Sequence, residues 1–401
     1  MKKVFLFSLF LVLGLVLSQC LPVWLGEAFL TAEKVAKTLM FVCLAFIMIN
    51  VGREFELDKT KWRSYAADYF IAMATAAVPW IMVAFYYMFL LPADLFGNWD
   101  AWKENLLLSR FAAPTSAGIL FTMLAAAGLR REWIYKKTQV LAIFDDLDTI
   151  LLMIPLQIFM IGFKWQLFAV VIVITFLLVI GWKKLGTIRL SQTWKSILFY
   201  AVCIVAVTES IYLLTKWMMG ADGAIHIEVL LPAFVLGMVM KTVHQHGNRD
   251  EKITGMISYL FMFLVGLSTP QFIGIDHGHR ITEAVGIIAA QPMPSWEVLV
   301  VHVIVVTLLS NLGKMFPLFF YRDRQLEERL ALSVGMFTRG EVGAGIIVIA
   351  MGYNLGGPAL IISVLSLVLN LLLTGGFVVI VKRLAQQAYG LKDPIVEYKM
   401  A

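Results

Sequence analysis

The sequence predicts an all-α polytopic membrane protein with about 12 transmembrane helices, and three observations lead to this prediction. Of the 401 residues, 60% are hydrophobic and only 15% are charged, and the mean hydropathy is +0.82. Soluble domains carry about 25% charged residues, because their surfaces must be covered with polar groups. The apolar residues also gather in windows long enough to cross ~30 Å of hydrocarbon. Finally, loops rich and poor in Lys and Arg alternate along the chain.

The apolar windows define the expected helices in chain order. They fall near residues 4–23, 38–52, 65–91, 105–129, 138–162, 165–182, 196–215, 227–240, 252–270, 297–321, 330–352 and 358–381. The windows at 38–52 and 227–240 are short, but omitting either would scramble the alternation of basic loops. Because most of the 33 Lys and Arg residues lie in every second loop and at both chain ends, both termini are expected in the cytoplasm of a cell (inner) membrane protein. All tryptophans except Trp80 lie at window ends or in adjoining loops, as an interfacial belt predicts.

Two windows in matching positions of the chain contain helix-breaking residues. The fourth window includes Phe111–Gly118, in which Pro114 removes a backbone donor. The eleventh window includes Gly335–Gly345, with four glycines and two charges. Paired interruptions at equivalent places predict an inverted-repeat transporter with a cation site near the bilayer midplane. The expected organisation is a first five-helix repeat over 1–162, connecting helices over 163–225 and a second repeat over 226–401.

Ionisable and hydroxyl side chains converge at the predicted midplane. They are Asp145, Asp146, Asp148, Lys314, Arg339, Glu341, Thr115 and Ser116. A charge at the bilayer centre costs ~2.5–3.5 kcal/mol, so these groups must pair, bind an ion or line water. Two adjacent carboxylates exchange protons as a coupled unit, and a nearby lysine competes with a cation for them. Such a site holds either protons or a small cation, which is the minimum machinery of cation/proton exchange.

Two further expectations concern the outer members of this set. Asp148 is either an extra ion ligand or an aspartate that stabilises helix packing. Arg339 and Glu341 are expected to form a supporting charge pair that braces the broken helix. Neither expectation requires a metal beyond the transported monovalent cation.

At these residues the sequence resembles the cation:proton antiporter-2 family of the sodium/proton exchanger superfamily, over most of the chain. The motifs that carry the resemblance are Asp145-Asp146, Thr115–Ile119, Lys314, Arg339-Gly-Glu341, Ile49–Glu54 and Phe261–Leu267. The resemblance implies the sodium/proton antiporter fold, with two crossed broken helices in a core and a panel that forms a homodimer. It further implies that Asp146 is the principal cation ligand, that Asp145 alternates between Lys314 and ion or proton, and that exchange is electrogenic. Asp148 departs from the family pattern.

The expected function is therefore secondary active transport, in which Na⁺ (or Li⁺ or K⁺) exchanges for protons by alternating access. The expected partners are these ions and the lipid bilayer, with no nucleic acid, no cofactor and no enzymatic activity. One alternative is a sodium-coupled organic-anion symporter of related fold. Another is an intramembrane Mg-dependent prenyltransferase, but that chemistry needs a second acidic cluster, which the second half lacks.

Overall fold

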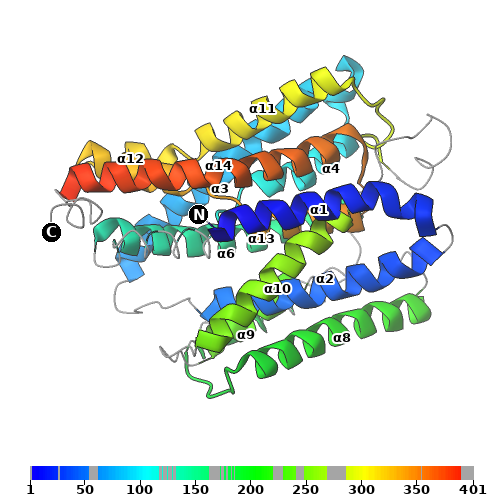
Figure 1. Cartoon of the computed structure of the whole chain (residues 1–401), viewed down its shortest axis with the longest axis horizontal. Coiled ribbons are helices and arrows are strands. Elements are labelled where there is room, and N and C mark those ends of the chain that lie inside the picture. Colours follow the sequence, from blue (N-terminus) through cyan, green and yellow to red (C-terminus); the bar gives the residue numbers. More distant parts are fainter. Residues whose placement is uncertain are drawn as a thin grey trace. The chain divides into compact units, whose positions relative to one another are not determined.

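The computed structural model of the chain is almost entirely helical (Figure 1). It describes residues 2–25, 28–53, 62–116, 120, 124, 129, 132–161, 172, 176–177, 179–181, 183–184, 186–219, 229–240, 248–268, 286–353 and 355–389. The chain divides into two compact units. The first unit comprises residues 1–8, 61–152 and 275–401, and the second unit comprises residues 9–60 and 153–274.

Every residue of the predicted ion site lies in the first unit, on its helices or in the segments between them. The helices of this unit are α3 (Trp62–Leu90), α4 (Trp99–Ser109), most of α6 (Trp133–Ile161), α11 (Trp296–Gly313), α12 (Leu326–Gly335), α13 (Glu341–Gly352) and α14 (Gly357–Tyr389). Short 3-10 helices accompany them: η2 (Ala93–Gly97), η3 (Arg110–Ala112) and η6 (Phe316–Phe319). In the second unit lie most of α1 (Lys2–Leu25), then α2 (Ala28–Arg53), α8 (Trp194–Met219), α9 (Leu230–Val239) and α10 (Asn248–Leu267).

Most described helices overlap the expected windows. Helix α4 begins before the window at 105–129, and most of that window after residue 116, like most of the window at 165–182, lies outside the described residues. The two short windows differ from each other. The window at 38–52 is the C-terminal part of α2, which has 26 residues. The first half of α2 contains polar residues, so hydropathy alone did not indicate that it belongs to the helix. The window at 227–240 contains α9, which has only 10 helical residues. Within the described residues, five helices are long and apolar enough to cross a membrane.

Hydroxyl and amide side chains line the contact between α11, α14 and α3 in the first unit, where α11 and α14 run side by side (Figure 1). Thr307 bonds Ser366 at 2.8 Å, and the Asn370 amide donates to Asn311 at 3.1 Å. These residues are buried. Polar contacts of this kind stabilise helix pairs in a membrane. Apolar side chains alone do not, because they contact lipid tails as favourably as they contact another helix.

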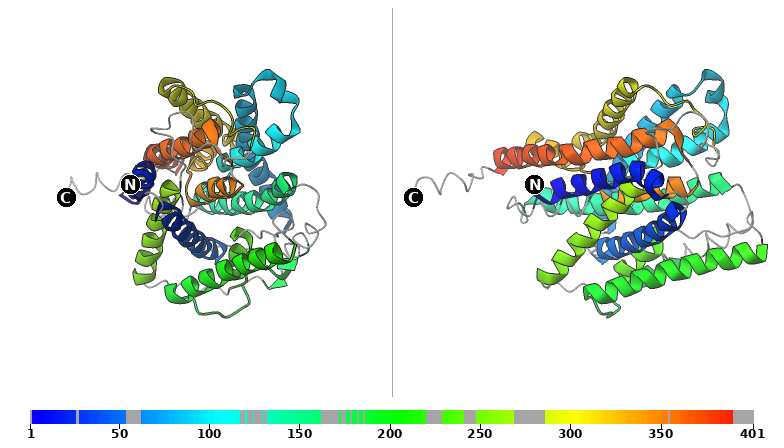
Figure 2. Two further views of the ribbon diagram at one scale, coloured as in Figure 1. Left: turned by 90° about the vertical axis from the view of Figure 1, so that its right-hand side faces the viewer. Right: turned by 45° about the vertical axis from the view of Figure 1, so that its right-hand side comes forward.

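Paired glycines bring two sets of helices into backbone contact in the second unit. A Cβ on Gly14 of α1 would lie 2.0 Å from the Phe263 carbonyl oxygen, and one on Gly266 of α10 would lie 2.2 Å from that of Leu11. Small residues are what permits helix backbones to approach this closely. Helix α8 lies along α2 in the same unit (Figure 2).

A second glycine pair joins α2 to α9 in the same way. A Cβ on Gly52 would lie 2.2 Å from the Phe234 carbonyl oxygen. A Cβ on Gly237 would lie 2.2 Å from the Ile49 carbonyl oxygen. Helix α1 thus contacts α10, and α2 contacts both α9 and α10.

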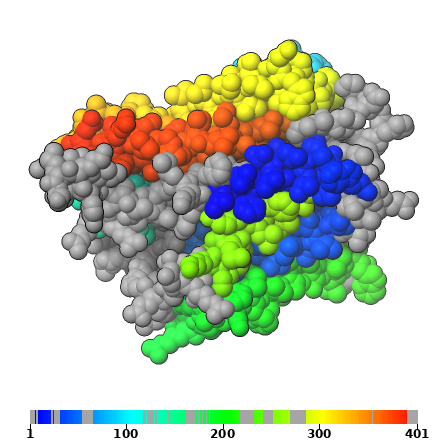
Figure 3. Space-filling view, viewed as in Figure 1, coloured from blue at the N-terminus to red at the C-terminus, as the bar shows by residue number. Residues whose placement is uncertain are grey.

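Each unit also presents large apolar side chains at its surface. On α11, in yellow in Figure 3, the exposed residues include Val300, Val301, Leu308 and Leu312. On α8, in green, Phe199, Leu213, Leu214 and Trp217 are exposed. Contiguous apolar surfaces of this extent are unusual on soluble proteins, and they suit contact with lipid chains.

Candidate functional site

Two helices of the first unit are interrupted where the sequence predicts. Helix α4 ends at Ser109 and is followed by η3, after which residues 113–116 are not helical. Pro114 contributes to this break because it cannot donate a backbone hydrogen bond. In the second half, α12 ends at Gly335 and α13 begins at Glu341, so residues 336–340 separate two half-helices.

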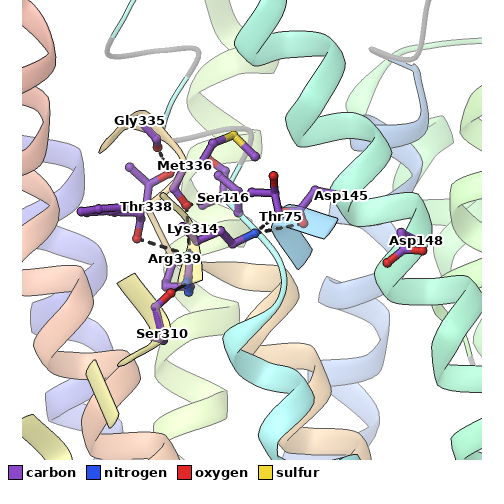
Figure 4. A network of polar contacts seen from close by, with 12 residues as sticks. Thr75, Ser116, Asp145, Asp148, Ser310, Lys314, Gly335, Met336, Thr338 and Arg339 are labelled. Carbon is purple, nitrogen blue, oxygen red and sulfur yellow. Dashed lines mark hydrogen bonds and ion pairs between the residues drawn. The ribbon is translucent and has the colours of Figure 1, made fainter. Parts of the chain in front are cut away.

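The two interruptions contact each other directly (Figure 4). The Ser116 backbone N–H donates to the Thr338 carbonyl at 2.9 Å, and the Thr115 hydroxyl donates to the Met336 carbonyl at 3.1 Å. The non-helical segments thereby satisfy part of each other's backbone, as buried polar groups in a membrane require. The structure therefore brings Thr115 and Ser116 into contact with the second break.

Asp145 of α6 forms a buried ion pair with Lys314. The Lys314 Nζ donates to both carboxylate oxygens, at 2.9 Å and 2.8 Å, and both side chains are 0% exposed. Asp146, the next residue of α6, is also 0% exposed, and its charge acts electrostatically on Lys314. The structure thus buries both aspartates and the lysine.

Asp148 contacts a different cation, one turn further along α6. The Arg110 Nη2 lies 3.2 Å from the Asp148 Oδ2 and donates to the Asp148 backbone carbonyl at 3.0 Å. Both side chains are buried. In Figure 4, Asp148 lies apart from the contact between Lys314 and Asp145.

Arg339 bonds to backbone carbonyls. Its guanidinium donates to Met336 at 3.1 Å, to Phe337 at 3.5 Å and to Ser310 at 3.2 Å. It thus satisfies carbonyls freed at the end of α12 and joins them to α11. Glu341 is the first residue of α13, but its side chain lies outside the described part of the structure. The predicted Arg339–Glu341 pair therefore remains a prediction.

The three buried cations share a position relative to helix ends. Arg110 follows the last residue of α4, Lys314 follows the last residue of α11, and Arg339 lies just beyond the end of α12. The C-terminal end of a helix carries a partial negative charge that stabilises a cation. Helix ends and the aspartates of α6 together therefore compensate three buried positive charges.

Sequence reasoning missed three residues near this site. Arg110 is a charge inside the apolar window at 105–129, and the sequence pattern indicates no partner for it; Trp80 is the tryptophan that lies away from the window ends. The Arg110 Cζ lies 4.4 Å from the Trp80 ring centroid, so the two anomalies explain each other. Thr75 of α3 is among the residues drawn in the polar network of Figure 4 and gave no signal in the sequence, because a single threonine in an apolar helix is common.

The chemistry of the site suits exchange of a proton with a hard monovalent cation. Carboxylates, hydroxyls and carbonyls converge, and oxygen is the donor that hard cations prefer. The Lys314 ammonium occupies both carboxylate oxygens of Asp145.

Comparison with known proteins identifies the family. The family model described as "Sodium/hydrogen exchanger, transmembrane" matches residues 2–386. The solved structure of the sodium proton antiporter MjNhaP1 from Methanocaldococcus jannaschii at pH 8 is similar in fold. Its TM-score is 0.60 at 13% sequence identity, with 96% of this chain and 92% of that chain covered. A comparison with curated protein sequences gives no match. The chain therefore belongs to the sodium/hydrogen exchanger family: it is a multi-pass membrane transporter that performs cation/proton antiport, and it is not an enzyme.

Proposed function

We propose that this protein exchanges Na⁺ for protons, with Asp145 and Asp146 as the groups that bind either ion. The observation that carries the proposal is the buried contact of Lys314 with both oxygens of Asp145. Asp146 is the principal cation ligand, and the hydroxyls of Thr115 and Ser116 are oxygen donors for the same ion.

Competition couples the two ions. When Na⁺ binds, Lys314 gives up a proton and releases Asp145, so that the cation replaces the ammonium beside the carboxylate. When Na⁺ leaves, Lys314 takes up a proton and its ammonium returns to Asp145, or a proton neutralises an aspartate. Because the site holds one positive species or the other, each transport step moves either Na⁺ or protons, and alternating access of the site to the two sides yields antiport.

Three further properties complete the proposal. Exchange is electrogenic, with more protons than cations moved per cycle, since two carboxylates and a lysine can release protons against one Na⁺. The protein acts as a homodimer, as the family resemblance implies. It lies in the cell (inner) membrane with both termini in the cytoplasm, as the distribution of Lys and Arg indicates.

Proton/cation exchange in proteoliposomes tests this function. Vesicles with an imposed pH gradient would receive Na⁺, Li⁺ or K⁺, and dissipation of the gradient would be followed with a pH-sensitive dye. Wild type should respond to Na⁺, and Asp146→Asn should abolish the response. The control is Asp100→Asn, an acid whose side chain is 65% exposed at the start of α4, which should leave exchange unchanged.

The outcomes are distinct. A wild-type protein that moves protons with K⁺ but not with Na⁺ would overturn the cation assignment and keep the mechanism. Full activity in Asp146→Asn would overturn the site. Exchange whose rate does not respond to an imposed membrane potential would overturn electrogenic transport.

A further inference from the structure

The guanidinium of Arg110 is an unusual buried cation. Arg110 is 0% exposed, and the side-chain hydrogen bonds that hold it both end on Asp148, one on the carboxylate and one on the backbone carbonyl. Its Nε and Nη1 find no hydrogen-bond acceptor among the residues that the structure describes. The face of the Trp80 ring, 4.4 Å away, compensates part of this loss through a cation–π interaction.

The position of this pair ties it to the ion site. Asp148 follows Asp145 by three residues on α6, so it lies about 4.5 Å further along the helix and on a similar side. The charge of Arg110 acts electrostatically on Asp145, and that of Asp148 acts on Lys314. Arg110 also begins η3, directly before the first interrupted segment. One contact therefore joins α6 to the start of that break.

The number of carboxylates near the ion site shows what the Arg110–Asp148 pair prevents. Three aspartates lie within four residues of α6. Without Arg110, they would present three carboxylates against Lys314 and Arg339. Clustered carboxylates bind divalent cations, and the affinity rises with the number of charged ligands. With Arg110 in place, the carboxylate oxygen Oδ2 of Asp148 is engaged.

We propose that Arg110 is a positioning residue that sets ion specificity: by holding Asp148, it restricts the cation site to Asp145 and Asp146 and keeps divalent cations from competing. The inference rests on the proposed function, because it assigns selectivity to the same site. It also assigns Asp148 as the partner of Arg110 and not as a third ligand.

The test compares wild type with Arg110→Gln, Arg110→Lys and the double variant Arg110→Gln/Asp148→Asn. The apparent KM for Na⁺, the maximal exchange rate and the inhibition of exchange by Ca²⁺ are measured in proteoliposomes. Equilibrium Ca²⁺ binding to the purified proteins gives a readout that does not need transport, and size-exclusion chromatography with thermal melting verifies folding.

We expect Arg110→Gln to be inhibited by Ca²⁺ at a concentration at least about ten-fold lower than wild type, because a third carboxylate is freed. The double variant should return to within about two-fold of wild type in Na⁺ KM and in Ca²⁺ inhibition, since removal of both partners leaves no unpaired charge. Arg110→Lys keeps the charge and should resist Ca²⁺, with a lower maximal rate because a lysine lacks the planar fork.

Two results would overturn the proposal. One is unchanged Ca²⁺ binding in a folded Arg110→Gln protein. The other is a double variant whose Na⁺ KM rises about ten-fold or more, which would make Asp148 a ligand. If Arg110→Gln does not fold, the double variant still decides. A wild-type protein without exchange would refute the proposed function separately, and Ca²⁺ binding would then still test the role of Arg110.

Discussion

Removal of the Lys314 ammonium should destabilise the protein through the carboxylate that it leaves behind. In Lys314→Met the side chain keeps a similar length and loses its charge. Asp145 then loses two hydrogen bonds of 2.9 Å and 2.8 Å from an ammonium that is 0% exposed. Asp145 is itself 0% exposed, so water cannot replace the lost partner.

The magnitude follows from the burial of both partners. Removing one partner of a buried ion pair costs about 3–5 kcal/mol, because the other charge stays in a low-dielectric environment. Removing both partners is often close to neutral. Lys314→Met/Asp145→Asn should therefore be more stable than Lys314→Met alone, although it should not transport.

Thermal unfolding of the purified proteins in detergent would measure this difference. The matched control is Lys37→Met, since Lys37 pairs with Glu33 at 2.7 Å but is 46% exposed. Exposed pairs contribute about 0–1 kcal/mol, so this control should melt close to wild type. If Lys314→Met melted like the control, or if the double variant were no more stable than Lys314→Met, the inference that the buried Asp145 carboxylate depends on Lys314 for stability would be refuted.

Three further predictions concern the fold around the site. Thr115→Ala should lose about 1 kcal/mol of stability and slow exchange, because the buried Met336 carbonyl at the second break loses one of its two donors; Thr115→Ser should retain both properties, and equal melting of the two variants would contradict the assignment. Gly266→Ala should prevent close contact of α10 with α1. In Gly255→Ala, on the same helix, the added methyl group meets open space, so this variant should melt at or above the wild-type temperature. Expression yields and melting curves of the two variants would be compared. Asp68→Asn should lower stability by about 1–3 kcal/mol, since Lys137 and Tyr321 both donate to that carboxylate; a melting temperature unchanged from wild type would refute this.

Much of the fold follows from patterns that act locally along the chain. Apolar windows predict helices because every backbone group must be satisfied inside lipid, and most described helices overlap those windows. Pro114 and the glycines after Gly335 predict two breaks for the same local reason. The extent of α2 was underestimated, because charged residues near its start resemble a loop when only hydropathy is considered.

The pairing of buried charges could not be predicted in this way. Arg110 and Asp148 are separated by 38 residues, and Lys314 and Asp145 by 169. Hydropathy marks each as anomalous but says nothing about which cation lies near which carboxylate. For Lys314 and Asp145, the family resemblance supplied the partner. The family resemblance indicated no partner for Arg110. The position of Trp80 away from the window ends was the remaining sign in the sequence of a buried cation nearby.

The sequence by itself determined the class of the protein, the approximate course of its helices and the residues with ion chemistry. These properties depend on composition and on spacing along one helix, which local physics controls. Only the tertiary structure decided that Lys314 holds Asp145, that Arg110 holds Asp148 and that Arg339 bonds to carbonyls at the end of α12. The reason is that partner choice among buried charges depends on how the helices and interrupted segments pack in three dimensions, and that packing brings together residues far apart in the chain, such as Lys314 and Asp145.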